Sequence, residues 1–227
     1  MSLNFKEAKK GASGNLAPIG NHIARCYQIV DLGTQDNPRY GNTAHKIRFV
    51  WELCEEMKDF GKGKPEPYSI NMTVNFFVGK NSHLQKLLEG WKGGTFTDAE
   101  WENFELKKLV GKACMINVVH ATVNDTDYAN VASVSPVPAK WKDRVPAMHN
   151  PPVYFEVEMG PNSKEYKSLN EYLQKQIDKC HEWKGSSTGL PPEDDADPFA
   201  DLKEEDEAFE KVENVKKDDD DSDSIPF

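Results

Sequence analysis

The first 138 residues alternate apolar and polar side chains in five stretches, which is the spacing of half-buried β-strands. The stretches cover 22–31, 45–53, 68–78, 113–123 and 128–134. In the second stretch, one face carries Ile47, Phe49, Trp51 and Leu53, and the other carries Lys46, Arg48, Val50 and Glu52. In the third, the even positions from Tyr68 to Phe76 are predicted to face inward and Phe77 outward.

The first stretch predicts Ala24, Cys26, Gln28 and Val30 on one face and Ile23, Arg25, Tyr27 and Ile29 on the other. Glycine, proline and asparagine gather in 33–43, and glycine, proline and lysine gather in 58–67, which predicts loops on either side of the second strand.

Helical spacing replaces the alternation between the third and fourth stretches. Ser82 is a helix-capping residue type, and it is followed by an apolar stripe of Leu84, Leu87, Leu88 and Trp91. Thr97 and Glu100 have the spacing of a capping box, which predicts a second short helix.

Three strands, a helical connection and two more strands predict a mainly β, α+β chain with the element order of an OB-fold. That fold is a five-stranded barrel whose strand 2–3 face and adjacent loops bind oligonucleotides or oligosaccharides. We assign 21–138 to this domain and 1–20 to a flexible N-terminal arm.

Residues 139–185 form a C-terminal extension, with a predicted strand over 153–159 and a predicted helix over 168–183. The apolar stripe of this helix could pack on the barrel or form a dimer contact. We favour packing on the chain's own body, and a homo-oligomer stays open.

Charge divides the chain more sharply than the pattern does. The formal charge is −10, which by itself argues against a nucleic-acid-binding domain. Residues 186–227, however, hold 16 acids and 4 bases, a net of −12, which leaves the body at +2. We therefore expect a disordered acidic tail over 186–227 behind a slightly cationic body.

The predicted binding face combines cations with aromatic rings, which suits a single-strand binder because phosphates need cations and any base can stack on a ring. The candidate residues are Arg25, Tyr27, Arg39, Tyr40, Lys46, Arg48, Lys58, Lys62, Lys64 and Phe77. The alternative, that each is an ordinary solvated charge or core aromatic, stays open for any single residue.

Catalytic and metal-binding motifs are absent from the sequence. It contains no P-loop, no G-x-G-x-x-G, no G-x-S-x-G, no H-E-x-x-H and no C-x-x-C pair. We predict no enzyme, no cofactor and no metal. No signal-peptide pattern or apolar run of membrane-spanning length occurs, so we expect a cytoplasmic protein that does not enter a membrane.

The last residues form the most specific motif. Acidic side chains precede an apolar end, and the residues are Asp218, Asp219, Asp220, Asp221, Asp223, Ile225, Pro226 and Phe227. A basic-rimmed pocket could take such an end by holding the ring and the carboxylate together.

This tip closely resembles that of bacterial single-stranded DNA-binding proteins, and the body is similar to divergent members encoded by tailed bacteriophages. The resemblance implies an OB-fold that holds single-stranded DNA and a tip that recruits replication, recombination and repair enzymes. It also implies that a phage-encoded chain acts in the cytoplasm of a bacterial host. The alternatives are an OB-like protein adaptor in a replication complex and, less favoured, a nuclease.

Overall fold

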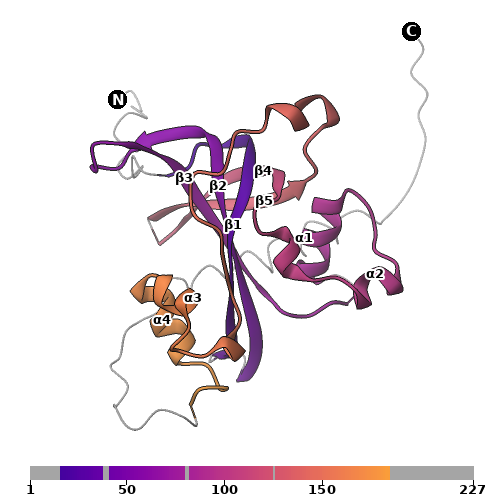
Figure 1. Cartoon of the computed structure of the whole chain (residues 1–227), viewed down its shortest axis with the longest axis vertical. Coiled ribbons are helices and arrows are strands. Elements are labelled where there is room, and N and C mark those ends of the chain that lie inside the picture. The colour runs from indigo at the N-terminus through magenta and orange to yellow at the C-terminus, as the bar shows by residue number, and fades with distance from the viewer. Residues whose placement is uncertain (1–15, 38–40, 80–81, 125, 185–227) are drawn as a thin grey trace, which may run out of the picture. The chain divides into compact units, whose positions relative to one another are not determined.

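The sheet of this protein is built around its first strand (Figure 1). The computed structural model describes residues 16–37, 41–79, 82–124 and 126–184. One edge of β1 (Gly20–Asn37) pairs antiparallel with β2 (Asn42–Asp59), which pairs antiparallel with β3 (Pro65–Asn75). The other edge pairs antiparallel with β4 (Ala113–Val123), which is followed by β5 (Thr126–Ser135), and in parallel with β6 (Val153–Phe155).

The mainly β, α+β architecture is confirmed, with five antiparallel strands, a helical connection after the third and a sixth strand beside β1. The strand order is β3-β2-β1-β4-β5, and within the described residues no ladder joins the two ends. The sheet is therefore not closed.

A β-bulge redirects the side chains of β1. The register with β2 passes from Cys26 to Gln28 and leaves Tyr27 as the extra residue. Ile29 therefore joins the same hydrophobic cluster as Cys26, whereas Val30 joins a second cluster. The predicted alternation, which placed Val30 on the face of Cys26, is wrong beyond the bulge.

The first cluster, called the inner cluster, lies between one face of the sheet and α1 (His83–Lys92). The Ser82 hydroxyl caps this helix by accepting from the Gln85 N–H at 3.1 Å. Trp91 is buried and donates its indole N–H to the Ala113 carbonyl at 3.1 Å. The predicted capping box of Thr97 is present at the start of α2 (Asp98–Glu102), and a 3-10 turn, η1 (Leu106–Leu109), leads into β4.

The second cluster, called the outer cluster, joins the opposite face of β1 to the C-terminal extension. This extension comprises η2 (Ala139–Arg144), β6, η3 (Val157–Met159), α3 (Lys164–Ser168) and α4 (Glu171–Asp178). Leu173 and Ile177 of α4 pack with Val30 and Leu32 of β1. The extension thus packs on the chain's own sheet, as favoured from the sequence.

Several element boundaries differ from prediction. The expected helix over 168–183 is divided because α3 ends at Ser168 and Asn170 caps α4 by accepting from the Leu173 N–H at 2.9 Å. The expected strand over 153–159 has only three strand residues. Most of the expected loop residues extend β1, β2 and β3 instead. Phe76, predicted to face inward, lies beyond the end of β3 and is 54% exposed.

Candidate nucleic-acid interface

The outer face of the sheet, opposite the inner cluster, is half covered and half open. The register aligns Glu52 with Ser69, Val50 with Asn71 and Arg48 with Thr73 across β2 and β3. On the β2 side, Val50 and Glu52 are buried, although the sequence pattern places them on the same face as Lys46 and Arg48. On the β3 side, an exposed polar row remains, consisting of Ser69, Asn71, Thr73 and Asn75.

Residues 145–152, called the strap, cover the β1 and β2 part of this face. The Glu52 carboxylate, only 1% exposed, accepts from the backbone N–H of His149 at 2.7 Å and of Asn150 at 2.8 Å. The Asn150 side-chain amide donates a third bond at 2.7 Å. Arg25 donates to the Pro146 carbonyl at 2.7 Å and to the Gly111 carbonyl at 2.9 Å. Arg25 and Glu52 are therefore occupied with holding the strap.

Arg48 lies in the middle of the face, where the covered and open halves meet. It is half-buried, and its Nε is buried without a hydrogen-bond partner among the residues that the structure describes. Burial lowers the pKa of Arg48, and the hydroxyl groups of Tyr172 and Tyr27 are close enough to influence it. An incompletely bonded guanidinium at the margin of an open surface is suited to an anionic ligand.

Tyr27 contributes a ring to the same surface because it is the bulge residue. It is half-buried, and its hydroxyl donates to the Ser69 hydroxyl at 3.3 Å. Burial raises the pKa of Tyr27, although the bond to Ser69 opposes this, so the phenol keeps its proton at neutral pH.

The hairpin between β2 and β3 carries a cation beside two rings, and one of these rings, Tyr68, packs against the inner cluster and not on the open surface. The Lys58 ammonium lies 6.0 Å from the centroid of the Phe60 ring and 5.8 Å from that of Tyr68. The two rings meet edge to face at 5.2 Å. Lys62 and Lys64 are exposed on the same hairpin, and Lys62 pairs with Glu66 at 2.8 Å.

The opposite end of β3 carries two exposed rings. Phe77 is 64% exposed and folds over Gly79, where an added Cβ would meet the ring at 2.5 Å. Phe76 packs at 5.4 Å from the ring of His45. Lys46 is half-buried beside them and aligns with Asn75. The open surface thus has an aromatic and a cationic group, Phe77 and Lys46, at its Asn75 end.

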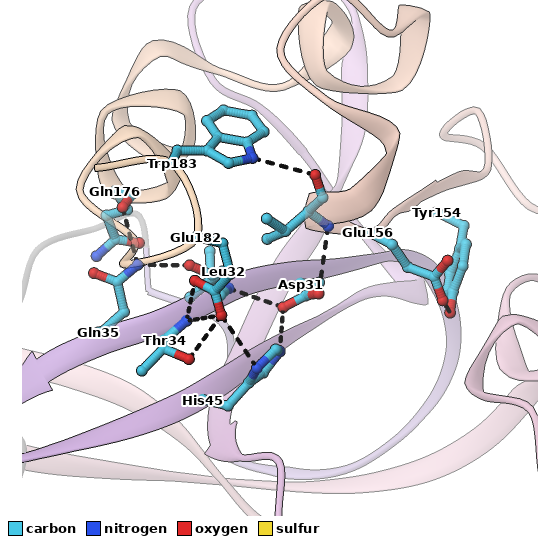
Figure 2. A network of polar contacts seen from close by, with 12 residues as sticks. Asp31, Leu32, Thr34, Gln35, His45, Tyr154, Glu156, Gln176, Glu182 and Trp183 are labelled. Carbon is cyan, nitrogen blue, oxygen red and sulfur yellow. Dashed lines mark hydrogen bonds and ion pairs between the residues drawn. The ribbon is translucent and has the colours of Figure 1, made fainter. Parts of the chain in front are cut away.

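A network of polar contacts, called the polar clasp and shown in Figure 2, ties the C-terminal extension to the end of β1 and the start of β2. His45 lies between two carboxylates, with Nε2 at 2.7 Å from Asp31 and Nδ1 at 3.7 Å from Glu182. Glu182 also accepts from the backbone N–H of Thr34 at 2.9 Å and from its hydroxyl at 2.7 Å. Burial alone would raise the pKa of Glu182, but these bonds outweigh it and lower the pKa to about 2.

A glycine makes this clasp sterically feasible. Gly33 has φ 69°, and a Cβ there would meet the Cys180 Cβ at 2.7 Å. Only a residue without a side chain allows β1 to approach the extension this closely.

Of the ten predicted binding residues, the structure describes eight. Four of them lie along the β3 side of the outer face, namely Tyr27, Lys46, Arg48 and Phe77. Three lie on the β2–β3 hairpin, namely Lys58, Lys62 and Lys64. The eighth, Arg25, holds the strap. Arg39, Tyr40 and the terminal motif Asp218–Phe227 lie outside the described residues.

Sequence reasoning missed Phe60, Tyr68 and Tyr172 as neighbours of these cations. Phe60 lies in 58–67, which reads as a loop, and Tyr68 was predicted only as an inward-facing strand residue. Tyr172 belongs to the extension, and nothing in its helical spacing indicates which face of the sheet α4 covers.

Within the described ranges, no cluster of three or more metal-ligating side chains is present. Over the same residues, no helix is both long and apolar enough to cross a bilayer. No protein-family model matches this sequence, and a comparison with curated proteins gives no match either. The geometry of the outer face is therefore the basis for assigning a function.

Proposed function

We propose that this chain binds single-stranded DNA along the open half of the outer face, without reading its sequence. The observation that carries the proposal is the position of Arg48, a half-buried cation that lies beside an exposed polar strand and whose Nε finds no hydrogen-bond partner in the described part of the chain. A phosphate beside the accessible part of this guanidinium would gain a charge-assisted hydrogen bond.

The surroundings of Arg48 support a flexible single strand as the ligand. The polar row of β3 offers hydroxyl and amide groups, with Phe77 and Lys46 at its Asn75 end and the Tyr27 hydroxyl bonded to Ser69. Base–aromatic stacking contributes about 1–3 kcal/mol per base and tolerates any sequence, because every base has a π-face.

The fold that we propose for 21–138 is of the OB type, a five-stranded barrel that is partly open, in keeping with the open ends of this sheet. Its support is the element order and the placement of α1, which packs on the inner cluster between the third and fourth strands. Fold alone does not give function, so the proposal depends on the site.

We propose no catalytic role. The terminal motif from Asp218 to Phe227 is proposed to recruit replication, recombination and repair enzymes, so that the body holds DNA and the tip holds partners. Removing Ile225–Phe227 is expected to abolish partner capture while leaving DNA affinity nearly unchanged.

A gel-shift titration with oligo-dT over a salt series tests DNA binding. Affinity is expected to fall steeply with salt, with a slope of log K against log salt of about −0.7 for each phosphate contacted. Arg48→Ala is expected to weaken binding and lower that slope by about one contact. Lys164→Ala, an exposed cation on α3, provides the matched control and should bind like the original chain.

Three results would contradict the proposal. Absence of a shift at low salt would favour the adaptor alternative. If the Arg48 and Lys164 variants bound oligo-dT equally well, Arg48 would not be part of the binding site. Metal-dependent cleavage of the oligonucleotide would point to a nuclease.

A further inference from the structure

The turn η2 presents an exposed tryptophan among cations. Its sequence from Ala139 to Arg144 is AKWKDR, and Lys140, Trp141, Lys142 and Arg144 are all exposed. Trp141 is 36% exposed, whereas the other four tryptophans are buried or half-buried. The Lys140 ammonium lies 5.1 Å from the Trp141 ring centroid.

This turn is followed directly by an anchored segment. Two residues after Arg144, the Pro146 carbonyl accepts from Arg25, and the strap then meets the buried Glu52 carboxylate. Arg25 and Glu52 are cross-strand partners on β1 and β2, next to Ser69 of the open row. The strap therefore connects the turn to the outer face that carries the proposed DNA site, and its fixed backbone reduces the ordering cost of binding there.

The chemistry of the turn favours a polyanion with flat rings. Three cations and one acid give it a net charge of +2 within six residues. An indole face offers a base the strongest stacking and cation–π surface among the side chains. A tryptophan that served only the core would not leave about a third of the residue's surface in solvent.

We propose that η2 is a second contact site for the single strand, in which Trp141 stacks on a base and Lys142 and Arg144 contact phosphates. This inference rests on the proposed function, because it extends the path of the same DNA strand beyond the strap. Arg25 and Glu52 act as positioning residues, since they hold the strap and do not contact DNA.

Fluorescence anisotropy with labelled oligo-dT of roughly 30 nucleotides, longer than the span of a single OB-type site, tests the inference on the full chain. Trp141→Ala is expected to weaken binding about fivefold or more, and Trp141→Phe less, because phenylalanine keeps a ring. Lys142→Ala should lower the salt slope by about 0.7, while Lys164→Ala should not change it.

A second readout reports the contact directly. Unlabelled oligo-dT is expected to quench the tryptophan emission of the original chain, and most of that quenching should disappear in Trp141→Phe. This measurement decides the matter even if the alanine variant folds poorly.

The possible failures are distinguishable. If the original chain does not bind oligo-dT, the proposed function fails and the inference fails with it. If the original chain binds but both Trp141 variants keep its affinity and its quenching, only the second site is overturned.

Discussion

Replacing Glu52 by glutamine tests whether the strap is held by a buried carboxylate. One oxygen of Glu52 accepts both bonds from Asn150, and the other accepts from the His149 N–H. An amide of the same shape keeps one acceptor and turns its NH₂ group toward one of these donors. The variant therefore loses at least one charge-assisted bond and leaves a buried donor unpaired, without creating a cavity.

The magnitude follows from these losses. A hydrogen bond to a charged group contributes about 1.5–3 kcal/mol, and an unsatisfied buried donor costs about 1–3 kcal/mol. The lost bond and the donor that it leaves unpaired are partly the same loss, so the two figures are not added in full. We therefore expect Glu52→Gln to lower the free energy of unfolding by about 2–3 kcal/mol. For a domain of this size, that is a fall in Tm of about 5–10 °C.

Urea unfolding followed by tryptophan fluorescence measures the change through the midpoint at constant m-value. The matched control is Glu66→Gln, which breaks the exposed ion pair with Lys62 and should change stability by no more than about 0.5 kcal/mol. If the two variants lose the same small amount, the strap is not held by the Glu52 carboxylate and the reasoning is refuted.

Four further outcomes are expected. Glu182→Gln should make the free energy of unfolding depend less on pH in the acid range. The folded pKa of Glu182 is lowered from 4.5 to about 2, so its contribution to stability is complete above pH 4.5 and is lost as the pH falls toward 2. Urea titrations at several pH values would reveal the difference. Gly33→Ala should destabilise the fold by more than about 1 kcal/mol in the same assay, since a Cβ has no space beside Cys180; an unchanged midpoint would contradict this. Phe77→Ala should weaken oligo-dT binding about fivefold while leaving Tm unaltered, because the ring is exposed. Deleting 186–227 should tighten oligo-dT binding, most strongly at low salt, because its net charge of −12 competes with DNA for the same cations; equal affinity with and without these residues would reject the competition.

The sequence predicts the core of the sheet well where burial enforces alternation. Phe49 and Trp51 are fully buried, as their spacing indicates, and Ser82 and Thr97 cap the helices expected to follow them. The hairpin ends were missed because strands that extend beyond a core need no alternation, and their glycines and asparagines read as turns.

The candidate site was predicted less completely. Lys46 and Arg48 lie on the outer face as alternation suggests, but Glu52 on the same face is buried by a strap almost a hundred residues further along the chain. The effect of the bulge at Tyr27 was also hidden, because one extra residue in a strand leaves no mark in its composition.

The sharing of β1 between two clusters has a consequence for shortening the chain. A fragment ending at residue 138 keeps the inner cluster but loses every extension residue that packs on Val30 and Leu32. It also loses β6 and thus leaves one edge of β1 unpaired from Gln28 to Val30, while the other edge stays paired with β2. Such a fragment would present an apolar patch beside an open strand edge, a combination that favours strand addition and aggregation. The smallest soluble fragment should therefore extend at least through Cys180, the last residue of the outer cluster.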